Sequence, residues 1–168
     1  MGKGDSRAVG RALIVSDTHG RLEGLREAIR EASPFGLLIH LGDLCGQAER
    51  VRGMTPGQVE MVAGNGDTGS GLPAEALVPL GNRLAWCVHG HRHMAGYGGQ
   101  ALKDGAGRQG ASIALYGHAH WPALDLEGPV AAVCPGSLTW PRQPGGRLSY
   151  ALAAIDVEGE VSFSIHYL

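Results

Sequence analysis

Short apolar runs recur along the first two thirds of the chain, and each is followed by glycine, histidine or an acidic residue. Five of these runs predict buried strands, at 12–16, 37–41, 59–63, 84–88 and 111–116. Between the first two, apolar positions recur at helical spacing and predict a helix over 22–32 that stops before Pro34. A strand–helix–strand order implies parallel neighbours with a right-handed crossover, so the chain begins as an α/β sheet.

The middle of the chain gives weaker patterns. A helix is a weak prediction over 47–53, and a single helical turn is predicted at 74–77. Segment 95–110 carries six glycines and only a short helical pattern, at 100–104. This pattern leaves open whether the segment forms a mobile flap or a crossover helix.

Beyond His120 the pattern changes to short runs that alternate between turn signals. These runs predict a meander of antiparallel strands at 123–126, 130–133, 148–157 and 161–167. Strand–helix units come first and strands last. We therefore predict an α/β sandwich with two sheets and helices on the outside.

Composition narrows the class of protein. A length of 168 residues predicts one domain with its own core, over 11–168, and the polar, glycine-rich residues 1–10 predict a flexible leader. The net charge of −2 predicts no binding of long nucleic acid, and no apolar run is long enough to predict a membrane span. Three cysteines, odd in number and far apart, are typical of a reduced, cytoplasmic protein.

Residues capable of metal or acid–base chemistry are concentrated where the five predicted strands end. Five of the eight histidines lie there. In chain order the segments are Asp17-Thr18-His19, Gly42-Asp43, Gly64-Asn65-Gly66-Asp67, His89-Gly90-His91 and Gly117-His118-Ala119-His120. In open α/β sheets, functional residues gather beyond the carboxyl ends of the strands. We therefore expect these segments to converge on one site.

The converging side chains would offer imidazole, carboxylate and amide ligands without thiolates. Such a mixed set suits Mn, Fe, Co, Ni or Zn and would make a poor all-oxygen calcium site. Seven or more ligands are too many for one ion and fit two ions that share a carboxylate. Taken alone, each segment has a simpler explanation, since Asp-x-His can cap a helix and Gly-Asp is a common turn. Their joint occurrence after five strands favours a metal site.

The ordered set of these five segments resembles the calcineurin-like metallophosphoesterase superfamily. The short length and the stretch 135–142, Pro-Gly-Ser-Leu-Thr-Trp-Pro-Arg, resemble its small YfcE-type phosphodiesterase branch. The resemblance runs from about residue 12 to the C-terminus. It implies a four-layer α/β/β/α sandwich, in agreement with the fold class predicted from the pattern.

The resemblance also implies two divalent metal ions, with Mn expected first and Ni, Fe, Co or Zn as alternatives. One ion would be held by Asp17, His19, Asp43 and His120, and the other by Asp43, Asn65, His89 and His118. Asp43 would bridge the two ions, and Asn65 would also face the substrate. A metal-bridging hydroxide would attack phosphorus, with both ions neutralising charge on the phosphoryl oxygens.

The chain departs from the superfamily pattern after the motif asparagine, where many members carry a histidine thought to protonate the leaving group. Here that position is Gly66, followed by Asp67. His91 is our candidate for the acid, with a supporting hydrogen-bonding role as the alternative, and Asp67 is a second candidate catalytic residue. Departure of a good leaving group without any protein acid is a further alternative.

Other polar residues are assigned from their place in the sequence. Thr139 and Arg142 are candidates for binding the substrate phosphate, Arg142 by bidentate contact, with a surface ion pair as its alternative. His40, inside a strand, is expected to be packed or hydrogen-bonded, and His93 is expected to face solvent from a loop.

The sequence therefore predicts a cytoplasmic dinuclear phosphoesterase acting on small phosphodiesters. A phosphomonoesterase on the same metal centre is the nearest alternative. A protein-binding scaffold, as this fold forms in the retromer subunit, and a metal-buffering protein are the others. The resemblance leaves a homodimer or tetramer open, and no membrane partner is expected.

Overall fold

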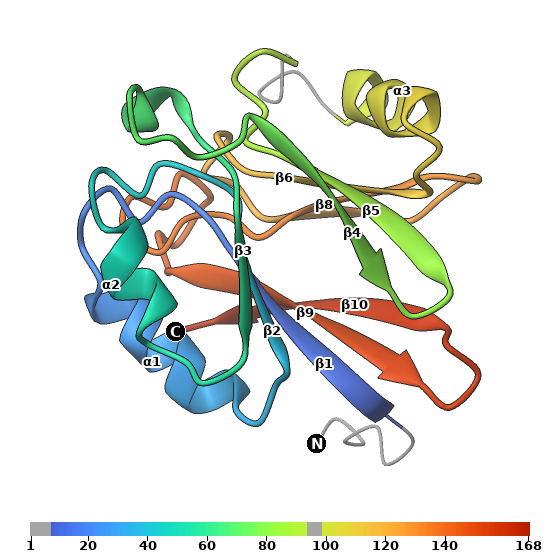
Figure 1. The fold of residues 1–168 in the computed structure, drawn as a ribbon, viewed down its shortest axis with the longest axis horizontal. Coiled ribbons are helices and arrows are strands. Elements are labelled where there is room, and N and C mark those ends of the chain that lie inside the picture. The colour runs from blue at the N-terminus through green and yellow to red at the C-terminus, as the bar shows by residue number, and fades with distance from the viewer. Residues whose placement is uncertain (1–7, 94–98) are drawn as a thin grey trace.

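A computed structural model describes residues 8–93 and 99–168 of the chain, and within them two five-stranded sheets pack face to face (Figure 1). The first sheet has the order β10–β9–β1–β2–β3, and the second has the order β4–β5–β6–β8–β7. The first sheet comprises β1 (Ala8–Val15), β2 (Leu37–His40), β3 (Gln58–Met61), β9 (Ser149–Asp156) and β10 (Val161–Tyr167). The second comprises β4 (Glu75–Leu80), β5 (Arg83–Val88), β6 (Ile113–Tyr116), β7 (Ala123–Asp125) and β8 (Ala131–Cys134).

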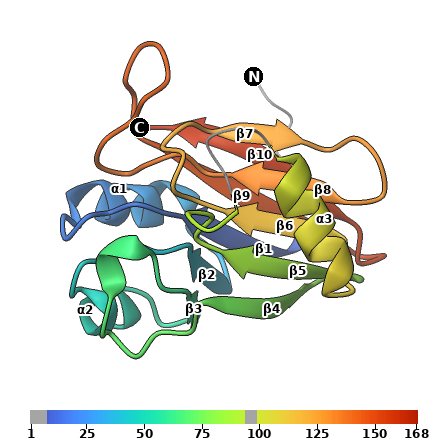
Figure 2. The ribbon, with the colours of Figure 1, turned by 90° about the horizontal axis from the view of Figure 1, so that it is seen from above.

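Helices cover the outer faces of the two sheets. The helices are α1 (Glu23–Ala32), α2 (Ala48–Arg52) and α3 (Gln100–Arg108), with a 3₁₀ turn, η1, at Asn65–Asp67. Helix α1 packs against the first sheet and α3 against the second, so the two lie on opposite sides of the strands (Figure 2). This is the predicted four-layer α/β/β/α sandwich.

The alternation along β1 shows how the sequence builds these layers. Ala12 and Ile14 join the apolar layer between the sheets, whereas Leu13 and Val15 point to the layer beneath α1. All four side chains are at most 1% exposed. Because successive strand residues face opposite sides, a continuous apolar run is the expected sequence of a strand covered on both faces.

Parallel pairing brings the functional loops to one edge. β1, β2 and β3 are parallel neighbours in the first sheet, as are β5, β6 and β8 in the second. The loops that follow these six strands meet at the edge opposite the start of β1 (Figure 1). The fold therefore gathers six short loops from two sheets around one place.

Three predictions of secondary structure need correction or completion. The helical turn predicted at 74–77 is wrong, because this segment begins β4, where Val78 and Leu80 alternate inward against β5. Segment 95–110 contains the crossover helix α3, whose Leu102 and Ala106 are fully buried. The crossover-helix alternative is therefore confirmed for this part of the segment, and residues 95–98 lie outside the described residues.

The predicted single meander after His120 is also wrong. Its first two strands, β7 and β8, belong to the second sheet, and β8 pairs in parallel with β6. Its last two, β9 and β10, complete the first sheet through antiparallel pairing of β9 with β1. Apolar faces were available on both sheets, and local alternation does not say which one a strand joins.

At the N-terminus, β1 starts at Ala8, earlier than the strand predicted at 12–16, and residues 1–7 of the predicted leader lie outside the described residues. Among the described helices, none has the length and apolar character needed to cross a membrane.

Candidate metal centre

Several residues in the loops after β1, β2 and β6 have an unusual backbone conformation, which sets the direction of their side chains. Six non-glycine residues of the described chain have a positive φ, between 46° and 66°, and all six lie in these loops: Asp17, His19, Asp43, Cys45, His118 and His120. Asp and His tolerate this left-handed region better than most residues, although it costs free energy that the surrounding structure must offset. Five of the seven predicted metal ligands therefore owe the direction of their side chains to a left-handed backbone conformation, which specific loop contacts must stabilise.

Two of the predicted ligand histidines have their ring orientation and tautomer set by backbone carbonyls. His89 donates from Nδ1 to the carbonyl oxygen of Leu41 at 2.7 Å, and His120 donates from Nδ1 to that of Trp140 at 2.8 Å. A neutral imidazole has one N–H, so in each neutral ring Nε2 carries a lone pair. Both rings are nearly buried, which keeps these lone pairs away from bulk water.

The free Nε2 atoms face carboxylates that cannot donate to them. His120 Nε2 lies 3.1 Å from Oδ1 of Asp17, and His89 Nε2 lies 3.4 Å from Oδ2 of Asp43 and 3.8 Å from Oδ1 of Asp17. Asp17 Oδ1 and His89 Nε2 have no hydrogen-bond partner among the described residues. Lone pairs that face one another in a buried site repel unless a cation or a proton lies between them.

His19 closes the arrangement on the other side of the carboxylates. Its Nε2 lies 3.6 Å from Oδ1 of Asp17, 3.6 Å from Oδ2 of Asp43 and 3.2 Å from Nε2 of His120. Two groups of three could each hold a cation, one of Asp17, His19 and His120, the other of Asp17, Asp43 and His89. Within each group the ligand atoms all lie within 4.8 Å of one another. These donors fit divalent cations with mixed nitrogen and oxygen ligands.

The remaining predicted ligands lie at the rim of this cluster. The His118 ring is 5.2 Å from the His89 ring between centroids, and its backbone N–H donates to Asp17 Oδ2 at 3.0 Å. Asn65 is exposed at the start of η1. Its neighbour Gly66 donates its N–H to Asp43 Oδ1 at 2.8 Å, which leaves Asp43 Oδ2 free toward the histidines.

Electrostatics within the cluster couples the acids and the imidazoles. Burial alone would raise the pKa of Asp17, but the facing rings of His120 and His19, which can donate to it once they are protonated, lower it well below its usual value. Burial opposes charge on His89 and His120, yet Asp43 and Asp17 respectively raise the pKa of each ring above its ordinary value. Without metal, protons on the His89 and His120 rings can therefore balance the charge of the acids. A bound cation would displace them, which makes metal affinity weaker at lower pH.

Glycine is required where two ligand loops touch. Gly42 has φ +101°, and a Cβ there would lie 2.6 Å from the backbone nitrogen of Gly64 and 2.8 Å from Nδ1 of His89. A Cβ on Gly64 would collide with the Asp43 carboxylate. The Gly-Asp and Gly-Asn pairs in the sequence thus allow the loops after β2 and β3 to approach within contact distance.

The comparisons with known proteins agree with this geometry. A family model described as the calcineurin-like phosphoesterase superfamily domain matches residues 11–158. The chain belongs to this superfamily. A probable metallophosphoesterase of Methanothermobacter thermautotrophicus (strain Delta H) is 30% identical over 134 residues, which cover 77% of each chain.

Two solved structures show how widely the superfamily fold is shared. Vacuolar Protein Sorting 29 from Cryptosporidium parvum superposes with a TM-score of 0.76 at 17% identity, over 95% of this chain and 97% of its own. A structure described as a novel archaeal phosphodiesterase superposes with a TM-score of 0.73 at 18% identity, over 94% and 99%. At these identities the likeness establishes the fold alone.

Asp67, a predicted catalytic residue, accepts hydrogen bonds from four backbone N–H groups. Its Oδ2 accepts N–H groups of Asp43, Leu44 and Gly64 at 2.7, 3.2 and 2.9 Å, and its Oδ1 accepts that of Cys45 at 2.8 Å. The side chain is buried. This carboxylate holds the loop that carries Asp43 in place, a role that nothing in its sequence position indicated.

His40 is hydrogen-bonded inside its strand end, as predicted. The backbone N–H of Gly42 donates to its Nδ1 at 3.2 Å, so the neutral ring donates from Nε2 to Thr18 Oγ1 at 3.0 Å. Burial lowers the pKa of this imidazole to about 4. His40 thus ties the loops after β1 and β2 together while uncharged.

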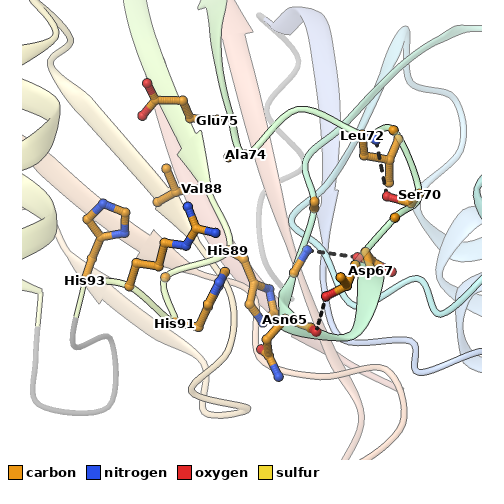
Figure 3. Close-up of a pocket in the computed structure, with 17 residues that line it drawn as sticks. Asn65, Asp67, Ser70, Leu72, Ala74, Glu75, Val88, His89, His91 and His93 are labelled. Atoms are coloured by element: carbon orange, nitrogen blue, oxygen red, sulfur yellow. Dashed lines mark hydrogen bonds between the residues drawn. The ribbon is translucent and has the colours of Figure 1, made fainter.

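A pocket of about 570 Å³ opens beside Asn65 and His89 (Figure 3). It is walled by the loop after β3, the start of β4 and the loop after β5, and the rings of His91 and His93 stand along one side. The His91 ring is 5.4 Å from His89 between centroids, close to the metal cluster but outside both candidate triads. Burial, together with the charges of His89 and Arg92, lowers the pKa of His91.

The remaining predicted residues are placed as follows. Thr139 donates from Oγ1 to the Thr18 carbonyl at 2.7 Å, which joins the loop after β8 to the loop after β1. Arg142 is exposed, with its backbone N–H bonded to the His120 carbonyl at 2.9 Å. His93 is half-buried with its ring edge-on to Trp86 at 5.0 Å, so the expectation that it faces solvent is wrong.

Sequence reasoning also missed Ser137, which is fully buried. Its hydroxyl donates to the Asp17 carbonyl at 2.9 Å and accepts the backbone N–H groups of Thr139 and Trp140 at 3.1 and 2.9 Å. It therefore orders the loop whose carbonyl orients His120. Its position between Gly136 and Leu138 gave no chemical signal of this role.

Proposed function

We propose that the chain is a dinuclear metal-dependent phosphoesterase that hydrolyses small phosphodiesters. One observation carries the proposal. The buried Nε2 lone pairs of His89 and His120, oriented by backbone carbonyls, face the carboxylates of Asp17 and Asp43. An arrangement of acceptors facing acceptors is stable when cations lie between them, and membership of the superfamily makes divalent metals the expected cations.

In our assignment Asp17, His19 and His120 would hold one ion, and His89, His118 and Asn65 would hold the other, with Asp43 shared. Support for sharing comes from Asp43 Oδ2, which lies 3.6 Å from His19 Nε2 and 3.4 Å from His89 Nε2. Asp17 Oδ1 reaches members of both groups as well, at 3.1 to 3.8 Å. Mn is the first ion to test, followed by Ni, Fe, Co and Zn.

The bound ions would polarise the phosphate oxygens and lower the pKa of a coordinated water. The chain's own residues would position the ligands. Asp67 accepts the backbone N–H of Asp43, and Gly66 donates to the Asp43 carboxylate. Ser137 holds the loop whose Trp140 carbonyl orients His120. We assign Asp67 to this positioning role in place of direct catalysis, because each of its oxygens already accepts backbone N–H groups.

The pocket beside Asn65 and His91 supports a small ester as substrate. Its volume of about 570 Å³ is in the range of sites for small molecules, and Arg92 is the one Lys or Arg among its lining residues. A diester has a second substituent that such a pocket could accept, and one structural neighbour is described as a phosphodiesterase. Exposed Arg142 remains our candidate for an additional phosphate contact, with Thr139 positioning its loop.

His91 lies where it could assist a departing alcohol. Replacing it by Gln should slow hydrolysis of diesters with poor leaving groups and leave those with good ones nearly unchanged, because only a basic leaving oxygen needs a proton. Equal rates for native and variant proteins with both kinds of ester would exclude His91 as the leaving-group acid.

The central test is hydrolysis of bis(p-nitrophenyl) phosphate and p-nitrophenyl phosphate by metal-stripped protein and after Mn is added. Faster diester cleavage that needs Mn would support the proposal. Faster monoester cleavage would make the protein a phosphomonoesterase on the same centre. Folded protein that binds Mn without turnover would favour metal buffering, and absence of both would favour the protein-binding scaffold.

Asp43→Asn gives the sharpest variant. The amide oxygen can keep the bond from Gly66, but the shared negative charge is lost, so turnover should fall at least about a hundredfold and Mn affinity should drop. Asp156→Asn is the matched control, because Asp156 accepts two backbone N–H groups in the turn between β9 and β10, away from the centre. Full activity of Asp43→Asn would refute the shared role of this residue.

A further inference from the structure

Two exposed tryptophans are connected with the half of the metal centre that contains His19 and His120, Trp140 by contact with His19 and Trp121 by its place next to His120 in the chain. Trp121 follows His120 in the chain and is 50% exposed, and Trp140 is 51% exposed. The third tryptophan, Trp86, is only 3% exposed and packs under α3. Leaving an indole ring half in water forfeits hydrophobic free energy, and the ring of Trp140 is left so while it contacts a predicted metal ligand.

Trp140 is tied directly to the metal ligands. Its ring centroid lies 4.3 Å from that of His19, with the planes inclined by 33°, and its carbonyl oxygen accepts the Nδ1 proton of His120 at 2.8 Å. The indole is therefore one imidazole ring away from the metal-facing Nε2 of His19. About half of the indole surface is still open to a ligand.

A phosphate bound at the metal centre would lie within reach of this surface. The pocket with Asn65 and His91 adjoins the His89 side of the centre, whereas Trp140 and Trp121 adjoin the His19 and His120 side. The two ester groups of a diester could thus be bound in different surroundings. An exposed indole favours a planar ring, because aromatic stacking combines apolar burial with a preferred geometry.

We propose that Trp140 and Trp121 form a stacking platform for a planar aromatic group on one ester of the substrate. This inference rests on the proposed function and narrows its substrate class to phosphodiesters of a nucleoside or another aromatic alcohol. Trp140 contacts the ring, and Trp121, next to a metal ligand, extends the apolar surface. Simple alkyl diesters lack the group that this platform binds.

The test is calorimetric binding of product-type phosphates to the Mn-loaded protein, which needs no turnover. Adenosine 5′-monophosphate should bind at least about tenfold more tightly than ribose 5-phosphate, which lacks the ring. Phenyl phosphate compared with methyl phosphate distinguishes the source of the ring. Preference for both aromatic ligands indicates any planar group, and preference for the nucleotide alone indicates a nucleoside.

Variants locate the effect. Trp140→Leu should remove most of the preference for adenosine 5′-monophosphate while ribose 5-phosphate binds within about twofold of native. Trp121→Leu should reduce the preference less, and Leu77→Ala, at a 48% exposed apolar residue on β4, should leave it unchanged. Trp121→Leu also keeps the test decisive if the Trp140 variant loses metal, because it leaves the Trp140 ring against His19 in place.

Three results would overturn the inference. Equal affinity of the native protein for both phosphates would show that no ring is recognised. Equal weakening of both ligands by Trp140→Leu would reduce Trp140 to a support for His19. A dimer that dissociates in both tryptophan variants would make the surface a contact between copies. Failure of the proposed function would appear separately, as Mn-loaded protein that cleaves neither diester nor monoester.

Discussion

Replacing Asp67 by Asn tests whether this carboxylate builds the metal centre or takes part in the reaction. The change is nearly isosteric, and it removes one acceptor oxygen. The amide oxygen can occupy the place of Oδ2 and keep the bonds from Asp43, Leu44 and Gly64. The NH₂ group then faces the backbone N–H of Cys45, which Oδ1 accepts in the native protein.

The expected cost follows from these bonds. Losing one charge-assisted hydrogen bond and leaving its partly buried donor unpaired should cost about 3 kcal/mol, and the other three bonds also weaken once the acceptor is neutral. In a chain of 168 residues this corresponds to a fall in Tm of about 10 °C. The loop that carries Asp43 should loosen as well, so Mn affinity should decrease.

The assay is urea denaturation of metal-free protein, followed by calorimetric titration with Mn. Asp156→Asn is again the control, because both N–H groups that Asp156 accepts bond to the same oxygen, which the amide retains. It should cost less than about 1 kcal/mol. Stability of Asp67→Asn equal to that of the control, with turnover lost, would refute the positioning role and restore Asp67 as a catalytic residue.

Two further predictions concern stability alone. His40 has a pKa of about 4 when folded and 6.5 as its ordinary value, so the unfolded chain binds its proton first and stability falls as pH drops from 6.5 toward 4. Urea denaturation at pH 7.5 and 5.0 should show that the free energy of unfolding falls by about 2 kcal/mol more in the native protein than in His40→Gln, which has no imidazole to protonate. Equal decreases would contradict the role of His40. In α3, Gly107→Ala should stabilise by about 0.5–1 kcal/mol, because no atom lies within 4 Å of the added methyl. Gly105→Ala should instead destabilise by about 1 kcal/mol, because its Cβ would lie 2.7 Å from the Trp86 ring, whose Nε1 is held by Glu75. Thermal denaturation of both helix variants checks the opposite signs, and a shared sign would show that packing against Trp86 does not control this helix.

Much of the architecture could be predicted because it is encoded locally. Apolar runs covered on both faces identify the strands that precede the ligand loops, and the helical spacing of 22–32 predicts α1 almost to the residue. The candidate ligands follow from the same pattern, because parallel strands bring their carboxyl ends to one edge. Asp17, His19, Asp43, His89 and His120 indeed lie together there.

Strand partners could not be predicted in the same way. Segment 74–77 was expected to form a helical turn, yet its backbone pairs with β5 as an edge strand, where Pro79 is tolerated. The final strands divide between two sheets because pairing of β9 with β1 joins residues more than a hundred positions apart. Such choices depend on which apolar face is left uncovered, and that is decided only when the sheets assemble.

By itself, the sequence determined which residue types end each strand, and so the chemistry that the site could offer. The tertiary structure decided how those residues are used. The carbonyl groups of Leu41 and Trp140 fix the tautomers of His89 and His120 by accepting their Nδ1 protons. Asp67 accepts the backbone N–H of Asp43 and so holds its loop. Those contacts join segments up to 48 residues apart in the chain. The bond from His89 to Leu41 joins the two sheets, and the other contacts join loops that follow neighbouring strands of one sheet. Both kinds depend on backbone groups, which every residue type carries, so the sequence does not reveal them.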